Sequence, residues 1–152
     1  MYRFNNKEIT IDKYDTPTPW MNYLSNGTFH TMISQAGGGV AFYKSPQIWR
    51  INHYKFFHVP TDRGGFYTYI KDGDEFWCPT NEPCREKPDK WTASHGMGYT
   101  RFYAEKNGIK AIATYFVGEF ENALIWYLKI TSDSDKKITL FPYVELGMIC
   151  FL

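Results

Sequence analysis

Hydrophobic and polar residues alternate with a period of two along the second half of the chain, which predicts β-strands. The alternation is clear at residues 99–104, and the dipeptide Asn107-Gly108 that follows is typical of a tight hairpin turn. The return segment 109–117 is rich in β-branched and aromatic residues, as strands require. Two further apolar segments, 123–131 and 138–146, are joined by a short polar turn. These patterns predict four consecutive strands in an antiparallel meander.

The first half of the chain contains shorter strand candidates, at residues 30–35, 40–44, 65–71 and 75–79. Glycine- and proline-rich segments separate them, and only a short stretch near residues 20–24 is compatible with a helix. Many short strands with regular turn signals predict an all-β chain that folds as an antiparallel β-sandwich. A β-barrel is the less favoured alternative.

Composition narrows the class of protein further. The chain has 152 residues, a formal net charge of +1, 43% hydrophobic residues and 19% aromatic residues. This size and balance fit one ordered domain with a hydrophobic core and exclude a disordered chain. The balanced charge disfavours binding to nucleic acid. No apolar stretch approaches the roughly 20 residues that span a bilayer, and the first residues lack a signal-peptide pattern, so we expect a cytoplasmic protein with no membrane partner.

Three cysteines, Cys78, Cys84 and Cys150, are present, so at least one cannot pair within the chain. Cys78 and Cys84 flank the loop Pro79-Thr80-Asn81-Glu82-Pro83, across which a disulfide is geometrically possible. Because nothing points to secretion, we expect free thiols. The spacing does not match a zinc site, and we expect no metal.

Gly37-Gly38-Gly39 could suggest a phosphate-binding loop, but no Lys-Ser/Thr pair follows. We therefore expect these glycines to allow two backbone segments to approach closely, or to form a bulge.

The segment 50–65 concentrates two arginines, two histidines, an aspartate and several aromatic residues without clear periodicity. Loops of this kind often carry function: aromatic rings can stack on sugar rings while charged and amide groups bind hydroxyls. The alternative is a core-lining segment in which Asp62 and Arg63 pair or cap a turn. His53 and His58 are poorly spaced for a metal site. His95 follows Ser94, yet no acid that would orient a Ser–His pair is evident, so His95 either faces a ligand or stabilises a turn. The residues by themselves show no catalytic machinery.

A series of short motifs occurs in order along the chain: 20–27 (WMNYLSNG), 37–46 (GGGVAFYKSP), 50–54 (RINHY), 59–64 (VPTDRG), 76–80 (FWCPT), 95–102 (HGMGYTRF), 114–117 (TYFV) and 143–145 (YVE). In this order they resemble the amino-terminal part of the glycoside hydrolase family 94 phosphorylases, which include cellobiose, chitobiose, laminaribiose and cellodextrin phosphorylases. The resemblance extends from about Trp20 to Glu145.

The resemblance implies a super-sandwich of the galactose-mutarotase-like type, of which residues 1–152 form the incomplete amino-terminal part. Family members are much longer and carry a catalytic (α/α)6 barrel that this sequence lacks. They cleave β-linked disaccharides or oligosaccharides with inorganic phosphate and inversion of configuration, without a metal or organic cofactor, and the full-length protein is expected to be a homodimer. No catalytic residue can therefore be assigned here, and we expect the chain to be inactive by itself. The alternative is an independent, non-catalytic carbohydrate-binding sandwich.

Seven residues are the candidates for sugar contact. Their side chains are charged, polar or aromatic, as sugar recognition requires: Arg50, His53, Asp62, Arg63, His95, Trp20 and Tyr23. Each has a structural alternative, with the two aromatic residues as core anchors and the Asp62–Arg63 pair as a salt-bridged turn.

Overall fold

The computed structural model describes residues 2–53 and 64–149, and every regular element in them is a β-strand. Six strands form one sheet in the order β1-β2-β9-β10-β11-β12. Their bounds are β1 Tyr2–Asn5, β2 Glu8–Ile11, β9 Lys90–Gly96, β10 Thr100–Lys106, β11 Ile109–Val117 and β12 Leu124–Ser132. All pairings in this sheet are antiparallel.

Two smaller sheets contain the remaining strands. A three-stranded sheet has the order β13-β7-β8, with β13 at Ile138–Val144, β7 at Phe66–Asp72 and β8 at Glu75–Trp77. A five-stranded sheet has the order β14-β6-β5-β4-β3, with β14 at Leu146–Ile149, β6 at Arg50–Asn52, β5 at Gly39–Tyr43, β4 at Phe29–Ser34 and β3 at Met21–Ser25.

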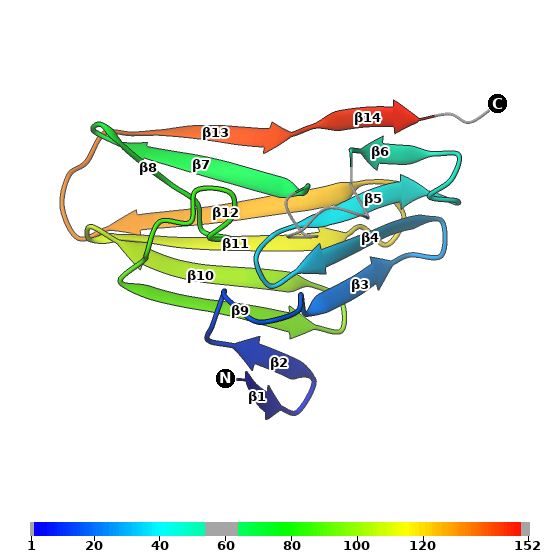
Figure 1. Cartoon of the computed structure of the whole chain (residues 1–152), viewed down its shortest axis with the longest axis horizontal. Coiled ribbons are helices and arrows are strands. Elements are labelled where there is room, and N and C mark those ends of the chain that lie inside the picture. The colour runs from blue at the N-terminus through cyan, green and yellow to red at the C-terminus, as the bar shows by residue number, and fades with distance from the viewer. Residues whose placement is uncertain (1, 54–63, 150–152) are drawn as a thin grey trace.

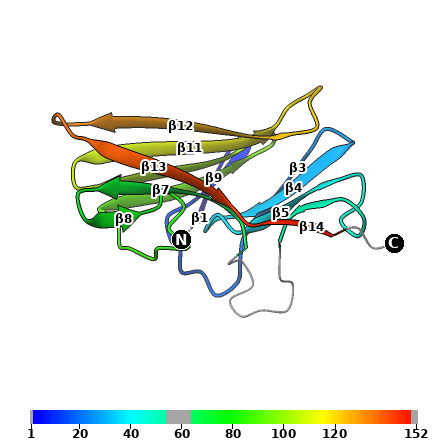
Figure 2. The same ribbon diagram turned by 90° about the horizontal axis from the view of Figure 1, so that it is seen from above.

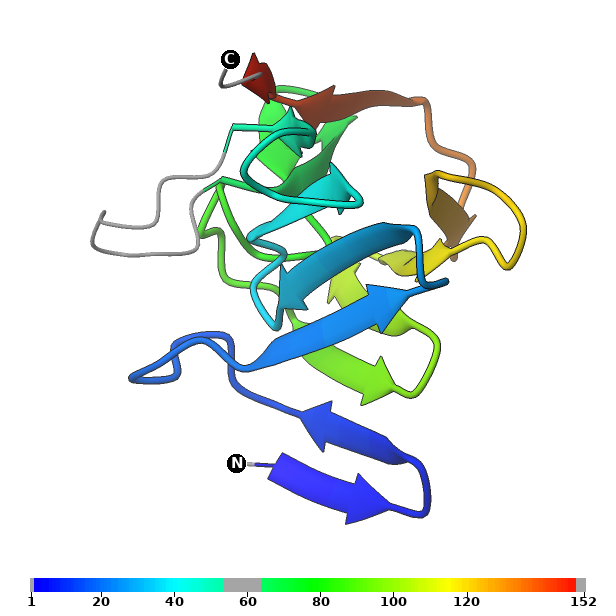
Figure 3. The ribbon, with the colours of Figure 1, turned by 90° about the vertical axis from the view of Figure 1, so that its right-hand side faces the viewer.

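The sheets are stacked in layers (Figures 1 and 2). In Figure 2 the long strands β11 and β12 lie on one side, and the three-stranded and five-stranded sheets lie next to one another on the other side. Strands β13 and β14 run almost end to end along the edges of these two sheets, with only Glu145 between them. Seen from the side, hairpin β1–β2 extends the six-stranded sheet beyond the second layer (Figure 3). The predicted all-β antiparallel sandwich is confirmed.

The predicted hairpin around Asn107-Gly108 is present between β10 and β11. Asn107 and Gly108 have φ angles of 53° and 74°, as a two-residue hairpin turn of the mirror-image type requires. The predicted four-strand meander is correct only for β10, β11 and β12. The fourth strand, β13, crosses to the other layer and pairs with β7, where Ile138 lies opposite Asp72 and Val144 opposite Phe66. Because a local turn signal does not specify the partner strand, alternation alone could not reveal this crossing.

In the first half, the four strand candidates correspond to β4, β5, β7 and β8. The stretch near residues 20–24, which its sequence left compatible with a helix, instead forms β3, in which exposed Tyr23 precedes buried Leu24. Segment 50–65, which we expected to be a loop, begins with strand β6. Among the described residues there is no helix with the length and apolarity that a membrane span needs.

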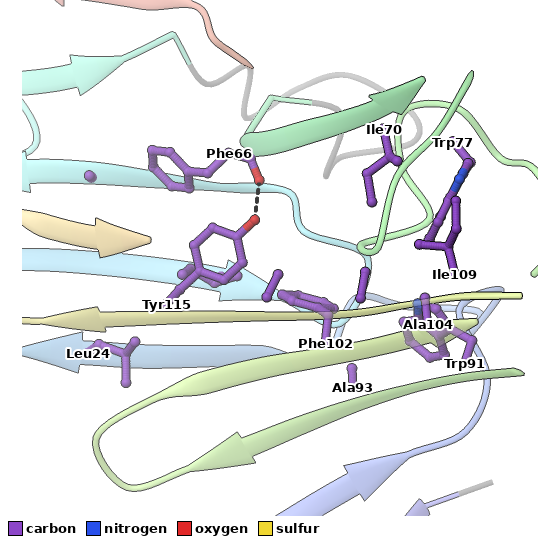
Figure 4. Packing of buried hydrophobic residues seen from close by; sticks show 14 of the residues in the cluster. Leu24, Phe66, Ile70, Trp77, Trp91, Ala93, Phe102, Ala104, Ile109 and Tyr115 are labelled. Atoms are coloured by element: carbon purple, nitrogen blue, oxygen red, sulfur yellow. Dashed lines mark hydrogen bonds between the residues drawn. The ribbon is translucent and has the colours of Figure 1, made fainter. Parts of the chain in front are cut away.

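The core lies between the layers and combines small and large side chains (Figure 4). The inner face of the six-stranded sheet carries four alanines, Ala93, Ala104, Ala111 and Ala113, all buried. Aromatic side chains of the second layer, including Phe66 and Trp77, belong to the same buried cluster. Small residues opposite large ones let two sheets pack densely. The hydroxyl group of Tyr115 donates a 3.1 Å hydrogen bond to the Phe66 carbonyl oxygen and ties strand β11 to β7 (Figure 4).

The predicted close approach of backbone segments at Gly37-Gly38-Gly39 is confirmed. Gly38 forms an isolated bridge with Gly65, and the Gly39 amide donates to the Gly64 carbonyl oxygen at 2.6 Å. A Cβ atom on Gly39 would overlap the backbone carbonyl group of Met32. Glycine is therefore required here by space.

Candidate functional site

The outer face of the five-stranded sheet carries a row of polar and aromatic side chains. Ser25 on β3 lies opposite His30 on β4, His30 lies opposite Phe42 on β5, and Phe42 lies opposite Arg50 on β6. Directly paired residues of an antiparallel sheet point to the same face, so these four side chains form one line across the strands. On the opposite face, Leu24 and its neighbours are buried in the core.

An open groove with a volume of about 250 Å³ lies over the part of this row that β3, β4 and β5 contribute. Residues of β3, β4 and β5 line it together with Pro46: Tyr23, Leu24, Ser25, His30, Thr31, Met32, Phe42 and Pro46. The exposed fraction of Tyr23 is 70%, although aromatic side chains are usually covered.

Contacts within the row hold its rings in place. The rings of His30 and Phe42 are stacked with centroids 5.0 Å apart and planes 21° apart. Ser25 Oγ and His30 Nδ1 share a hydrogen bond of 2.9 Å. The Arg50 Nε–H group donates to the Pro46 carbonyl oxygen at 3.2 Å. The groove thus presents aromatic surface beside an imidazole and a hydroxyl, and the Arg50 guanidinium lies farther along the same row, outside the lining. This combination suits a flat, partly apolar ligand bearing hydroxyl groups.

Of the sequence-predicted candidates, Tyr23 lines the groove, whereas Arg50 lies at the far end of the row, on strand β6, and is not part of the lining. His53 lies just beyond the end of β6 and belongs to a different cluster. Its Nδ1 atom is 2.9 Å from Glu145 Oε1, and its backbone amide donates to the Glu145 carbonyl oxygen at 2.7 Å. Both side chains are well exposed, at 36% and 54%. This double contact joins the end of β6 to the link between β13 and β14.

His95 lies near the end of β9 and is buried, with an exposed fraction of 8%. Its Nε2 atom is 3.0 Å from the Trp20 carbonyl oxygen, and its Nδ1 atom is 3.1 Å from Thr100 Oγ1. Nε2–H can donate to the carbonyl oxygen while Nδ1 accepts from the threonine hydroxyl, which is the pattern of a neutral imidazole. Burial lowers the pKa of His95 and favours this neutral form. Both ring nitrogens of His95 thus have partners within the chain, which tie the end of β9 to Trp20 and to Thr100 on β10.

Trp20 precedes β3 and contacts the other layer. Its ring centroid lies 4.9 Å from that of Tyr2. Gln35 contacts its backbone twice: Gln35 Oε1 accepts from the Trp20 amide at 2.7 Å, and the Gln35 amide donates to the Trp20 carbonyl oxygen at 3.0 Å. Trp20 is half-buried and lies outside the groove lining. Asp62 and Arg63 lie outside the described residues.

Sequence reasoning missed several residues of the site. His30 and Phe42 belong to segments predicted as strands, but only the pairing register places them beside each other. Asn52 is fully buried, where its Oδ1 accepts from the Ala41 amide at 2.8 Å and its Nδ2 donates to the Gly39 carbonyl oxygen at 2.9 Å. Asn52 ends the three-residue strand Arg50-Ile51-Asn52, and nothing in that short polar stretch of sequence marks its side chain as buried. No group of three or more potential metal ligands occurs in the described part of the chain.

Comparison with known proteins identifies the family of this chain. A family profile described as "Glycosyl hydrolase 94, supersandwich domain" matches residues 7–149. The chain is 37% identical over 149 residues to N,N'-diacetylchitobiose phosphorylase of Vibrio furnissii, covering 94% of this chain and 18% of that protein. It is 30% identical to solabiose phosphorylase of Paenibacillus borealis, covering 95% of this chain and 19% of that protein. It is 29% identical to 3-O-beta-D-glucopyranosyl-beta-D-glucuronide phosphorylase of the same species, covering 97% and 18%.

The matches cover the amino-terminal part of these phosphorylases, and the chain spans about a fifth of the length of these relatives. The profile match, the layered antiparallel sheets and the ordered motifs agree with one another. The chain belongs to the glycosyl hydrolase 94 supersandwich-domain family.

Proposed function

We propose that this chain is a non-catalytic supersandwich unit of a disaccharide phosphorylase, an enzyme that transfers a glycosyl group from a β-linked disaccharide to inorganic phosphate. The observation that carries the proposal is the alignment of nearly the whole chain with the amino-terminal part of three phosphorylases that act on different disaccharides. In this proposal residues 1–152 contribute the first part of the sandwich, and the catalytic barrel is a separate domain.

The settings of two carboxylate groups, Glu75 and Glu145, are consistent with a non-catalytic role. Phosphorolysis needs a general acid that can give its proton to the leaving sugar. Glu145 is engaged by His53, and Glu75 lies near Lys106 and accepts a hydrogen bond from Asn107 at 2.9 Å. Both side chains are exposed, whereas a catalytic acid is typically held in a buried, apolar setting. In the proposed enzyme the general acid therefore comes from the barrel and the nucleophile is inorganic phosphate, without a metal or organic cofactor.

Two measurements test this assignment. The purified chain is incubated with N,N'-diacetylchitobiose in phosphate buffer, and the release of sugar 1-phosphate is followed. We expect release no faster than in buffer without protein; faster release would show that the chain is itself catalytic. The gene is also read beyond the Leu152 codon, where we expect a long open frame with the pattern of a helical barrel. A stop codon at that point would contradict the proposal.

We also propose that the full-length enzyme is a cytoplasmic homodimer, as the family resemblance and the sequence of the chain lead us to expect.

The groove on the five-stranded sheet favours a second function, direct contact with saccharide. We propose that Tyr23, with its exposed ring, and the stacked pair of His30 and Phe42 hold a sugar ring while Arg50 and Ser25 bind its hydroxyls. The support is the geometry of the row, in which two aromatic contacts and three polar groups share one open face.

Saturation-transfer NMR with N,N'-diacetylchitobiose tests this second function. We expect Tyr23→Ala to abolish the transfer signal, because the ring that stacks on the sugar is lost. Tyr127→Ala is the matched control, since Tyr127 is a similarly exposed tyrosine, at 58%, on strand β12 of the other sheet. Equal signals from the two variants, or no signal from the native chain, would contradict sugar binding at the groove while leaving the family assignment intact.

A further inference from the structure

Two cysteines lie face to face at the end of strand β8. The Sγ atoms of Cys78 and Cys84 are 3.3 Å apart, and both cysteines are free thiols. A disulfide bond has an S–S length of about 2.05 Å, so closure requires a movement of little more than 1 Å. The sequence only allowed Cys78 and Cys84 to be close enough for a disulfide. In the folded chain they are in contact and share a hydrogen bond.

The loop between the two cysteines is held by its own hydrogen bonds. Thr80 Oγ1 donates to the Glu82 carbonyl oxygen at 2.7 Å, and the Asn81 amide donates to the Cys78 carbonyl oxygen at 3.1 Å. Arg85 forms an ion pair with the buried carboxylate of Glu82 at 2.7 Å. The loop thus brings the two thiols together before any bond forms, and the entropy cost of closing the ring is already met by folding.

The two thiols differ in exposure and acidity. Cys78 is buried, with an exposed fraction of 5%, whereas Cys84 is partly exposed. The hydrogen bond between them lowers the pKa of the Cys84 thiol and raises the pKa of Cys78, which burial raises further. Burial and the nearby Glu86 and Glu82 carboxylates oppose the lowering at Cys84, the positive charge of Lys106 adds to it, and the pKa of Cys84 is lowered overall. The accessible thiol, Cys84, is therefore the one that ionises more readily, as a redox-reactive cysteine requires. The second thiol, Cys78, is in contact with it and can form a disulfide once Cys84 is oxidised.

We propose that Cys78 and Cys84 form a reversible oxidation site for peroxides. The Cys84 thiolate attacks a peroxide oxygen; an S–O bond forms, the O–O bond breaks, and hydroxide leaves and is protonated to water. The Cys78 sulfur then attacks the Cys84 sulfenic acid; the S–S bond forms, the S–O bond breaks, and the departing hydroxide takes the Cys78 proton as a second water. In sum, two thiols are oxidised to a disulfide and hydrogen peroxide is reduced to two waters. A dithiol reductant reverses the reaction.

The surroundings of the pair connect its redox state to the core. Trp77 precedes Cys78 and is buried, and the Trp91 indole donates to the Pro79 carbonyl oxygen at 3.0 Å. Thr80 of the same loop packs so closely on Gly37 that a Cβ atom there would overlap it. Closing the disulfide shifts a loop that touches both tryptophans, so oxidation is expected to change tryptophan fluorescence.

Peptide mass analysis tests the proposal directly. Cleavage after Lys71 and Arg85 places both thiols on one tryptic peptide, residues 72–85, while Cys150 lies on another. The reduced native chain is treated with one equivalent of hydrogen peroxide, alkylated with N-ethylmaleimide in denaturant and digested. We expect peptide 72–85 to be unalkylated and two hydrogens lighter, and to take two labels after dithiothreitol. Cys150 should stay alkylated throughout.

Three comparisons make the outcome decisive. Cys150→Ser should respond like the native chain, whereas Cys84→Ser should lose the fluorescence change, and Cys78→Ser should hold a sulfenic acid that dimedone traps. The native chain unfolded in urea should form the disulfide more slowly than the folded chain, because folding provides the contact. Retention of two labels on peptide 72–85, or equal rates in the folded and unfolded chains, would overturn the proposal. Both results come from the native sequence, so they hold even where a serine variant fails to fold.

Discussion

Asn52 provides the sharpest test of how this sandwich is held together. Its side chain is fully buried and bridges β6 to β5: Oδ1 accepts from the Ala41 amide and Nδ2 donates to the Gly39 carbonyl oxygen. Strands β5 and β6 share only the pairing of Phe42 with Arg50 as a register position. The Asn52 amide therefore takes the place of backbone hydrogen bonds that the short ladder lacks.

Replacing Asn52 with alanine leaves a buried N–H group and a buried carbonyl group without partners. Each such group costs about 1–3 kcal/mol, so the expected loss in the free energy of unfolding is roughly 2–6 kcal/mol. This is a large share of the about 5–15 kcal/mol that stabilises a typical domain. At roughly 2–4 °C per kcal/mol for a chain of this size, the melting temperature should fall by about 10 °C.

Urea unfolding followed by tryptophan fluorescence and far-ultraviolet circular dichroism measures this loss. Gln47→Ala is the control, because Gln47 is an exposed amide in the turn before β6 and should change stability by less than about 0.5 kcal/mol. If Asn52→Ala unfolds at the same urea concentration as Gln47→Ala, the two hydrogen bonds of Asn52 do not stabilise the fold and the reasoning is refuted.

Three further predictions concern single positions. Gly39→Ala should destabilise the chain by several kcal/mol, since its Cβ would overlap a backbone carbonyl, whereas Gly98→Ala, with open space around it, should be nearly neutral in thermal melts. Tyr115→Phe should cost about 1 kcal/mol in urea unfolding, because one hydrogen bond between the layers is lost; no change would mean that this bond adds nothing. Burial lowers the pKa of His95, so the unfolded chain binds this proton more readily. The His95 contribution should be complete above the ordinary histidine pKa of about 6.5 and be lost as the pH falls through the lower pKa of the folded state; a His95→Gln variant should have a flatter stability profile below pH 6.5, and an equally steep one would contradict this reasoning.

Local signals in the sequence determined the elements whose contacts are local. The turn at Asn107-Gly108 and the alternation on either side predict the β10–β11 hairpin, because the turn and both strands lie within one short segment. The three glycines at 37–39 predicted a close backbone approach for the same reason: the absence of a side chain is visible in the sequence itself. The ordered motifs identified the family, which the profile match confirms.

Tertiary structure decided the pairings between distant segments. Strand β13 follows β12 directly in the sequence, yet it pairs with β7, because sheet partners are set by core packing across the layers and a turn signal cannot specify them. The position of His95 illustrates the same limit: its partner, the Trp20 carbonyl oxygen, lies 75 residues earlier.

The sequence by itself determined that this chain is an all-β sandwich of the phosphorylase family with three cysteines and an excess of aromatic residues. Only the tertiary structure decided which aromatic residues are exposed, because the register of three strands, β3, β4 and β5, places Tyr23 and the stacked His30–Phe42 pair on one outer face. It also decided that Cys78 and Cys84 are in contact, since the hydrogen bonds of the loop between them determine the distance between their sulfur atoms. Sequence patterns specify which residues are available, and long-range packing specifies which of them meet.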